Sequence, residues 1–155
     1  MIAAPALATT YQATLFELES RLSDHSHTAV GALGERTAWL MFERAGYEVS
    51  RAQDFHGDLR VVDRATGQVA YVEVKTARRS KDRKWRFTLV KRGHTDHRDS
   101  DFVLLLPVLA SGQAVPFIIP VVALADQRQA VITSDPHTYK GKLSTYRRSN
   151  LTDFM

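Results

Sequence analysis

The sequence predicts a fold of the α/β or α+β class, with a central mixed sheet flanked by helices. Helical spacing of apolar residues is confined to about the first 45 residues, after which apolar residues recur with a period of two. The 155 residues are 44% hydrophobic and 25% charged, which is the composition of one ordinary globular domain. Helices followed by a run of strands pack economically as one sheet with helices on its faces.

The N-terminal part is expected to add a helical extension to this domain. Residues 1–10 show no periodic pattern, and we expect them to be loose. Leucines at helical spacing predict a helix over Tyr11–Leu22, so that residues 11–28 form the extension. Residues 29–155 are then expected to form the core of the domain.

A second helix is predicted at the start of this core. The polar residues 24–28 offer N-cap side chains, and the helix is expected over Ala29–Ala45. Val30 and Leu33 belong to its apolar stripe. Gly46 stands where a helix C-cap belongs.

The remainder of the chain is expected to be mostly strand. A hairpin turn at residues 64–67 joins the second and third strands, and a turn at residues 111–113 joins a buried pair. Residues 120–126 are expected to form a short helix. The predicted strands are Tyr47–Arg51, Asp58–Asp63, Gln68–Thr76, Trp85–Val90, Phe102–Leu109, Ala114–Ile119 and Ala130–Ser134.

The third of these strands carries the most informative residues. Alternate side chains of a strand share a face, so Glu73 and Lys75 point the same way and the neighbouring valines point the other way. A strand apolar enough to be central rarely displays two ions for packing reasons, because each needs solvation or a partner. The pattern therefore indicates a functional site on this strand.

A second carboxylate is expected beside Glu73. Asp58 opens the strand that the hairpin turn pairs with the central one, so the two carboxylates converge at one end of the sheet. Two carboxylates repel each other unless a cation lies between them, and Mg²⁺ favours carboxylates together with retained waters. The competing interpretation is a Lys–Glu salt bridge between strands, with Asp58 as an ordinary turn residue.

A third carboxylate comes from the predicted helix. Glu35 lies among small residues, near the core-facing side of the helix and one turn before Trp39. A carboxylate near an apolar face needs a partner, which a metal site on the adjacent sheet would supply. An ordinary exposed glutamate is the competing interpretation.

The basic residues are concentrated in two segments of a chain whose net charge is +4. Residues 78–98 hold nine basic and two acidic residues, and residues 137–148 hold four basic residues and no acidic one. Two basic segments on an otherwise acidic body indicate a polyanionic partner, although solvated surface charge would give the same pattern. Within the first segment, Trp85 is expected to pack in the core rather than stack on a base.

Four short motifs follow one another along the chain: Gly34-Glu35-Arg36-Thr37-Ala38, Gly46-Tyr47-Glu48-Val49, Gly57-Asp58-Leu59 and Val72-Glu73-Val74-Lys75-Thr76. Taken in this order, they resemble the PD-(D/E)xK nuclease superfamily. Within it, the likeness is greatest to Holliday junction resolvases of the archaeal and phage type. The segment Tyr139–Tyr146 is also similar to intron-associated endonucleases of the superfamily. Gly57 stands where the superfamily's name has proline, and the loop before it is shorter than in archaeal resolvases.

The resemblance implies a restriction-endonuclease-like fold and a metal-dependent DNA endonuclease. Asp58 and Glu73 would bind Mg²⁺, for which Mn²⁺ is expected to substitute, and the main-chain carbonyl of Val74 would be a further ligand. Glu35 would be a metal-binding or supporting acid, and Lys75 would orient the attacking water and offset charge on the phosphate. The residues expected to bind DNA are Arg78, Arg79, Lys81, Arg83, Lys84, Arg86, Lys140 and Lys142.

The resemblance also implies a partner and an assembly. Resolution of a four-way DNA junction needs two symmetric cuts, so a homodimer is expected, and residues 102–109 and 114–119 could supply interface as well as core. The longest apolar runs are too short to span a bilayer, and we expect a cytoplasmic location, in a prokaryotic cell or from a phage gene. The alternatives are another endonuclease of the superfamily (intron-associated homing, restriction-like or repair) and a non-catalytic DNA-binding module.

Overall fold

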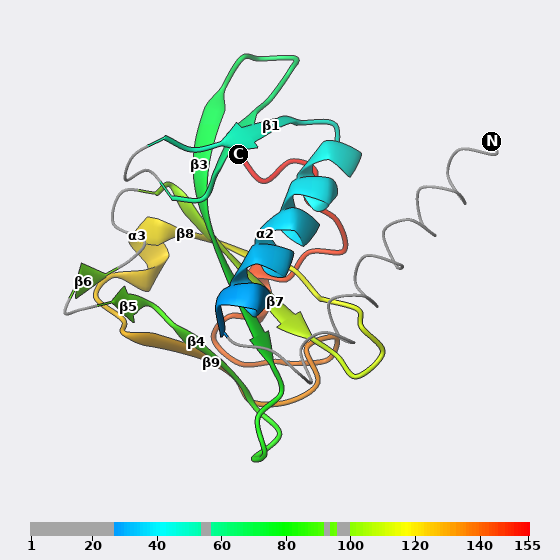
Figure 1. Ribbon diagram of the computed structural model, residues 1–155, viewed down its shortest axis with the longest axis vertical. Coiled ribbons are helices and arrows are strands. Elements are labelled where there is room, and N and C mark those ends of the chain that lie inside the picture. Colours follow the sequence, from blue (N-terminus) through cyan, green and yellow to red (C-terminus); the bar gives the residue numbers. More distant parts are fainter. Residues whose placement is uncertain (1–26, 54–56, 92–93, 96–99) are drawn as a thin grey trace.

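The computed structural model describes residues 27–53, 57–91, 94–95 and 100–155. The predicted helix Tyr11–Leu22 and the loose residues 1–10 lie outside this part. Within it, a central sheet carries α2 on one face and a two-stranded ribbon on the other (Figure 1).

The central sheet is mixed, as predicted. Its strand order is β1-β2-β3-β7-β8, in which β3 and β7 are parallel and the other neighbours are antiparallel. Two small sheets, β4-β9 and β5-β6, complete the strands. The elements are α2 (His27–Arg44), β1 (Glu48–Arg51), β2 (Leu59–Val62), β3 (Val69–Arg78), β4 (Trp85–Thr88), β5 (Val90–Lys91), β6 (His94–Thr95), β7 (Phe102–Val108), β8 (Phe117–Pro120), α3 (Val121–Leu124), β9 (Gln129–Ile132) and the 3-10 helix η1 (Ser144–Tyr146).

Two hydrophobic cores lie on opposite faces of this sheet. Along β7, Leu104 and Leu106 pack into the core beneath α2, while Val103 and Leu105 pack into the core beneath β4 and β9. This alternation follows from the two-residue period of a strand, and a strand buried on both faces is continuously apolar. The position of β7 between the two cores explains why its sequence has no polar face.

The C-terminal tail closes the core beneath α2. The ring of Phe154 lies 5.3 Å from that of Phe42, 5.2 Å from that of Tyr47 and 5.0 Å from that of Phe102, measured between centroids. Figure 1 shows the C-terminus beside β1. The last residues of the chain therefore help to hold α2 against the sheet.

Most predicted elements are confirmed within a few residues, and two expectations are wrong. The predicted strand Ala114–Ile119 is paired as a strand only from Phe117, with a single bridge from Ala114 to Val108, because Pro116 has no N–H to donate to a ladder. Side chains 103–108 and 114–119 are buried within the chain itself, so of the two segments expected to supply a subunit interface only the ends Phe102 and Leu109 keep part of an apolar side chain exposed.

The contact between α2 and β3 depends on a glycine. A Cβ placed on Gly34 would lie 1.7 Å from Oγ1 of Thr76, whereas a Cβ on Gly31, one turn earlier, would meet nothing within 4 Å. The Thr76 hydroxyl is buried and has no hydrogen-bond partner among the described residues. The helix thus approaches the central strand as closely as a residue without a side chain allows.

Gly34→Ala is therefore expected to destabilise the protein, and Gly31→Ala to stabilise it. The clash should lower the free energy of unfolding by about 1–3 kcal/mol, the usual cost of overpacking. Gly31→Ala should raise it by up to about 1 kcal/mol, because alanine favours a helix over glycine. Denaturant unfolding of both variants tests this, and equal effects at the two positions would contradict the close contact.

Candidate active site

A notch in the central sheet forms the framework of the site. The pairing of β2 with β3 ends at Leu59 and Val72, while the pairing of β3 with β7 continues to Arg78. Beyond Val72 one edge of β3 is therefore no longer covered by β2. Main-chain groups on that edge are available to side chains and ligands.

Asp58 occupies the start of the notch. The main-chain N–H of Asp58 donates to Val72 O at 3.0 Å, and its carboxylate oxygen Oδ2 accepts a hydrogen bond from Val74 N at 2.7 Å. Gly57 makes this placement possible, because its φ is 101° and a Cβ would lie 2.6 Å from Ser100 Oγ. The carboxylate thus binds the Val74 N–H, which a main-chain carbonyl would bind if β2 began earlier in the chain.

Glu73 and Lys75 lie on one face of β3, as predicted. Lys75 Nζ is 3.4 Å from Glu73 Oε1, and their side chains are 19% and 15% exposed. The ion pair that the competing interpretation required is present, but within one strand rather than between two. It lies in the wall of a cleft, where part of each ion remains accessible.

Glu35 reaches the same place from α2. Burial raises the pKa of its carboxyl group, and the charge of Asp58 and a hydrogen bond between the two side chains raise the pKa further, while Arg51 opposes the shift. Two acidic groups in contact indicate a region where negative charge is crowded. The competing interpretation of Glu35 as an ordinary exposed residue is wrong, because its side chain is half-buried and contacts Asp58.

These side chains line one open cleft of about 580 Å³. Its volume lies in the range of ordinary ligand sites. From the sequence we expected Arg86 only as part of a DNA-binding segment, whereas the structure places it in the wall of this cleft. The lining residues are Val30, Gly31, Glu35, Asp58, Glu73, Val74, Lys75, Thr76, Arg86, Phe87 and Thr88.

The oxygen donors of the cleft fit a hard cation with few protein ligands. Among the described residues, no three His, Cys, Asp or Glu side chains gather closely enough to enclose an ion. Asp58 and Glu73 nevertheless face one cleft, and the carbonyl of Val74 lies on the uncovered edge of β3, beside its N–H. This set suits Mg²⁺, which binds one or two carboxylates and keeps waters, and does not suit a closed zinc site.

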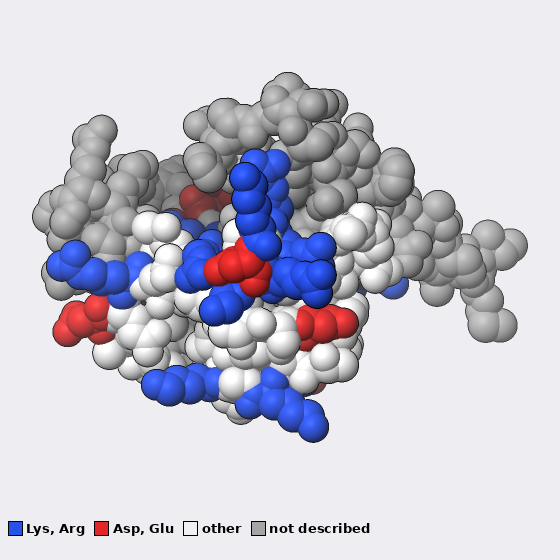
Figure 2. Space-filling view, turned by 90° about the horizontal axis from the view of Figure 1, so that it is seen from below, with Lys and Arg blue, Asp and Glu red and all other residues white. Residues whose placement is uncertain are grey.

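The residues expected to bind DNA fall into three groups. Arg86 lines the cleft, while Arg79 and Arg83 line a separate groove. Figure 2, which views the lower end of Figure 1, shows lysines and arginines gathered there around fewer acidic side chains. The other predicted residues line neither hollow: Arg78, Lys81, Lys84, Lys140 and Lys142. Trp85 is buried and donates to Val108 O at 2.9 Å, which confirms that it packs.

In the loop before Arg86, the carboxylate of Asp82 binds the guanidinium group of Arg86. Asp82 accepts hydrogen bonds from Ser80 Oγ and from the Arg86 guanidinium, and these hydrogen bonds lower the pKa of Asp82 to about 2. Ser80 Oγ and Ser80 N also both contact Lys84 O. Asp82 thus orients Arg86, although both residues belong to the same basic segment. The net charge of that segment gave no indication of this role for Asp82.

Glu35→Gln is expected to raise the thermal stability of the metal-free protein at neutral pH. The pKa of Glu35 is raised in the folded state, so ionisation of Glu35 destabilises the fold as pH rises above its ordinary value of 4.5. The stabilisation by glutamine should be complete above the folded pKa and shrink as pH falls towards 4.5. Melting temperatures across this range test it, with the exposed Glu48→Gln as control. A variant no more stable than wild type at neutral pH would contradict the charge crowding.

Comparison with known proteins supports the fold. No protein-family model matches the sequence, and no curated protein matches it. One solved structure, entitled as that of a bacterial homing endonuclease, I-Ssp6803I, matches with a TM-score of 0.62 and 20% sequence identity. The match covers 79% of this chain and 86% of that one, and at this identity it shows a shared fold. The helices of the described part are all too short or too polar to cross a membrane.

Proposed function

We propose that this protein is a metal-dependent DNA endonuclease. The observation that carries the proposal is the convergence of Glu35, Asp58, Glu73 and Lys75 on one cleft, at the point where β3 loses its neighbour β2. The shared fold of a bacterial homing endonuclease supports it, as does the ordered set of nuclease-like motifs.

Each of these residues has a distinct part in the proposed reaction. Asp58 and Glu73, with the carbonyl of Val74, would hold Mg²⁺, which supplies polarisation of the phosphoryl oxygen and a lower pKa for a nearby water. Lys75 would orient the attacking water and donate to a phosphate oxygen, where its charge offsets the charge that develops in the transition state. Glu35, whose carboxyl group is partly buried and hydrogen-bonded to Asp58, would hold the Asp58 carboxylate in position.

The substrate within DNA has two candidates. The structural neighbour is a homing endonuclease, which favours a site in duplex DNA. The motif resemblance favours a four-way junction, and a homodimer would then supply the second active site. A non-catalytic DNA-binding module is disfavoured, because it would have no need of two carboxylates and a lysine in one cleft.

A cleavage panel tests the proposal and separates the candidates. Purified protein is incubated with duplex, flap, bubble and four-way junction DNA, with Mg²⁺, with Mn²⁺ or with a chelator. We expect cutting that depends on the divalent ion. Preferential, paired cuts in the junction would identify a resolvase, whereas cuts at one sequence in a duplex library would identify a site-specific enzyme. Absence of cutting in every DNA form with either ion would contradict the proposed function.

A further inference from the structure

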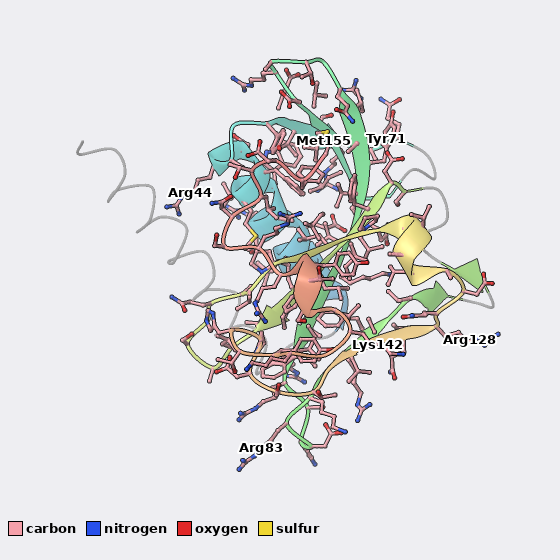
Figure 3. All side chains as sticks on the ribbon, turned by 180° about the vertical axis from the view of Figure 1, so that it is seen from behind. Arg44, Tyr71, Arg83, Arg128, Lys142 and Met155 are labelled. Atoms are coloured by element: carbon pink, nitrogen blue, oxygen red, sulfur yellow. The ribbon has the colours of Figure 1, made fainter. Side chains whose placement is uncertain are left out.

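A second basic hollow, referred to below as the groove, is lined in part by the loop between β3 and β4. This groove has a volume of about 520 Å³ and is assembled from three separate parts of the chain: the β3–β4 loop, the β7–β8 turn and the segment after β9. Figure 1 shows the β3–β4 loop projecting from the lower end of the molecule, and Figure 3 places Arg83 at that end. The lining residues are Arg79, Arg83, Trp85, Leu109, Ala110, Ser111, Thr133, Ser134 and Asp135.

The chemistry of the groove suits a phosphate group. Arg79 and Arg83 are exposed, and neither guanidinium makes a hydrogen bond or an ion pair with another described residue. Ser111, Thr133 and Ser134 add hydroxyl groups, which commonly contact DNA phosphates. Two arginines and three hydroxyls in a concave surface offer several donors at once to an anion.

The other two polar side chains of the groove are already engaged. The Trp85 indole N–H donates to Val108 O, so the ring is fixed as part of the floor. Among the described residues that line the groove, Asp135 is the one carboxylate, and its Oδ1 accepts a hydrogen bond from His137 N at 2.9 Å. With two arginines against one carboxylate, the groove keeps a net positive charge.

Hydrogen bonds within the loop between β3 and β4 fix its shape. Ser80 N donates to Lys84 O at 2.8 Å, Arg83 N donates to Ser80 O at 2.9 Å, and Asp82 holds Arg86 on the cleft side. Arg83 has a φ of 63°, in the left-handed region. The loop thus carries Arg79 and Arg83, which line the groove, and its Asp82 binds Arg86 of β4, which lines the cleft.

We propose that this groove is a second phosphate-binding subsite, which holds the backbone of a duplex DNA arm after it leaves the cleft. The inference rests on the proposed function and adds to it the path of the DNA. Arg79 lies four residues after Lys75, which corresponds to about 13 Å at the rise of an extended strand. That length corresponds to about four base-pair steps of B-form DNA. For a duplex whose axis runs along β3, the groove therefore holds a phosphate about four base pairs from the cut.

Binding measurements in the inactive Asp58→Asn background test this subsite. The test variant is Arg79→Ala/Arg83→Ala. The matched control is Arg44→Ala/Arg64→Ala, which removes the same charge from exposed residues that line neither the cleft nor the groove. Figure 3 shows Arg44 well away from Arg83. Each protein is titrated with a long duplex and with one that ends about two base pairs beyond the mapped cut, short of the groove.

The test variant should bind the long duplex more weakly than the control does. Its slope of log affinity against log salt should also be smaller in magnitude than that of the control by about 1.8, or about 0.9 for each lost phosphate contact. It should bind the short duplex as tightly as the control does. A neutral methylphosphonate about four base pairs from the cut should weaken binding of the control but not of the test variant. An equal loss on both duplexes, or an unchanged slope, would overturn the subsite. Failure of the proposed function would appear differently, as DNA that is bound but never cut by the wild-type protein.

Discussion

Asp58→Asn is expected to reduce DNA cleavage by at least about 10³-fold, the scale on which lost electrostatic stabilisation acts. The substitution removes the negative charge that would hold a divalent cation, while the amide oxygen can still accept the hydrogen bond from Val74 N. The fold and DNA binding should therefore be largely retained. Single-turnover cleavage at saturating Mg²⁺, together with a thermal melt, measures both effects.

Asp101→Asn provides a closely matched control for this variant. Asp101 Oδ2 accepts a hydrogen bond from Tyr71 N at 2.8 Å, so it too is a carboxylate that binds an N–H of β3. Asp101 does not line the cleft. Asp101→Asn should thus have a comparable effect on stability and should leave the cleavage rate near that of wild type. Equal losses of activity in the two variants would mean that Asp58 serves the fold and not the reaction.

Lys75→Met is expected to lower the cleavage rate by about 10²-fold or more, the usual range for a lost charge-stabilising or proton-transferring group. Methionine keeps much of the length of the side chain but removes the ammonium group that lies 3.4 Å from Glu73 Oε1. The loss should appear in the rate at saturating DNA and Mg²⁺, while the affinity for Mg²⁺ falls little or not at all.

The magnesium dependence separates the proposed role of Lys75 from a structural one. If Lys75 served only to neutralise Glu73, its removal would change the binding of a cation at that carboxylate and leave the rate at saturation unchanged. A rate within about twofold of wild type at saturating Mg²⁺ would thus reduce Lys75 to a salt-bridge residue, because a catalytic group is worth far more.

The position of the candidate site was predictable because it depends on local patterns. The two-residue period places Glu73 and Lys75 on one face of β3, and a short hairpin brings the start of β2 beside the same strand. Gly46 has a φ of 98° and ends α2, as its position predicted. Each of these inferences uses residues that are close in sequence, where the geometry of the chain leaves few choices.

Features that depend on long-range packing were not predictable in this way. The groove beside Arg83 combines residues from three parts of the chain, and only the tertiary structure brings them together. The contact of Gly34 with Thr76 depends on how closely α2 packs on β3, and that of Phe154 with Phe42 on the path of the C-terminal tail. The place of Arg86 in the cleft depends on the hydrogen bonds of the loop before it.

The location of a bound metal ion tests most directly whether the cleft is a metal-dependent active site. Crystals of the protein with uncut DNA and Mn²⁺, measured for anomalous scattering, would show where the ion lies. The proposed metal site predicts a peak in the notch of the sheet, at the carboxylates of Asp58 and Glu73 and the carbonyl of Val74, with a DNA phosphate beside it and no such peak in Asp58→Asn. A peak elsewhere, or DNA bound in the cleft without an ion at these two carboxylates, would contradict it.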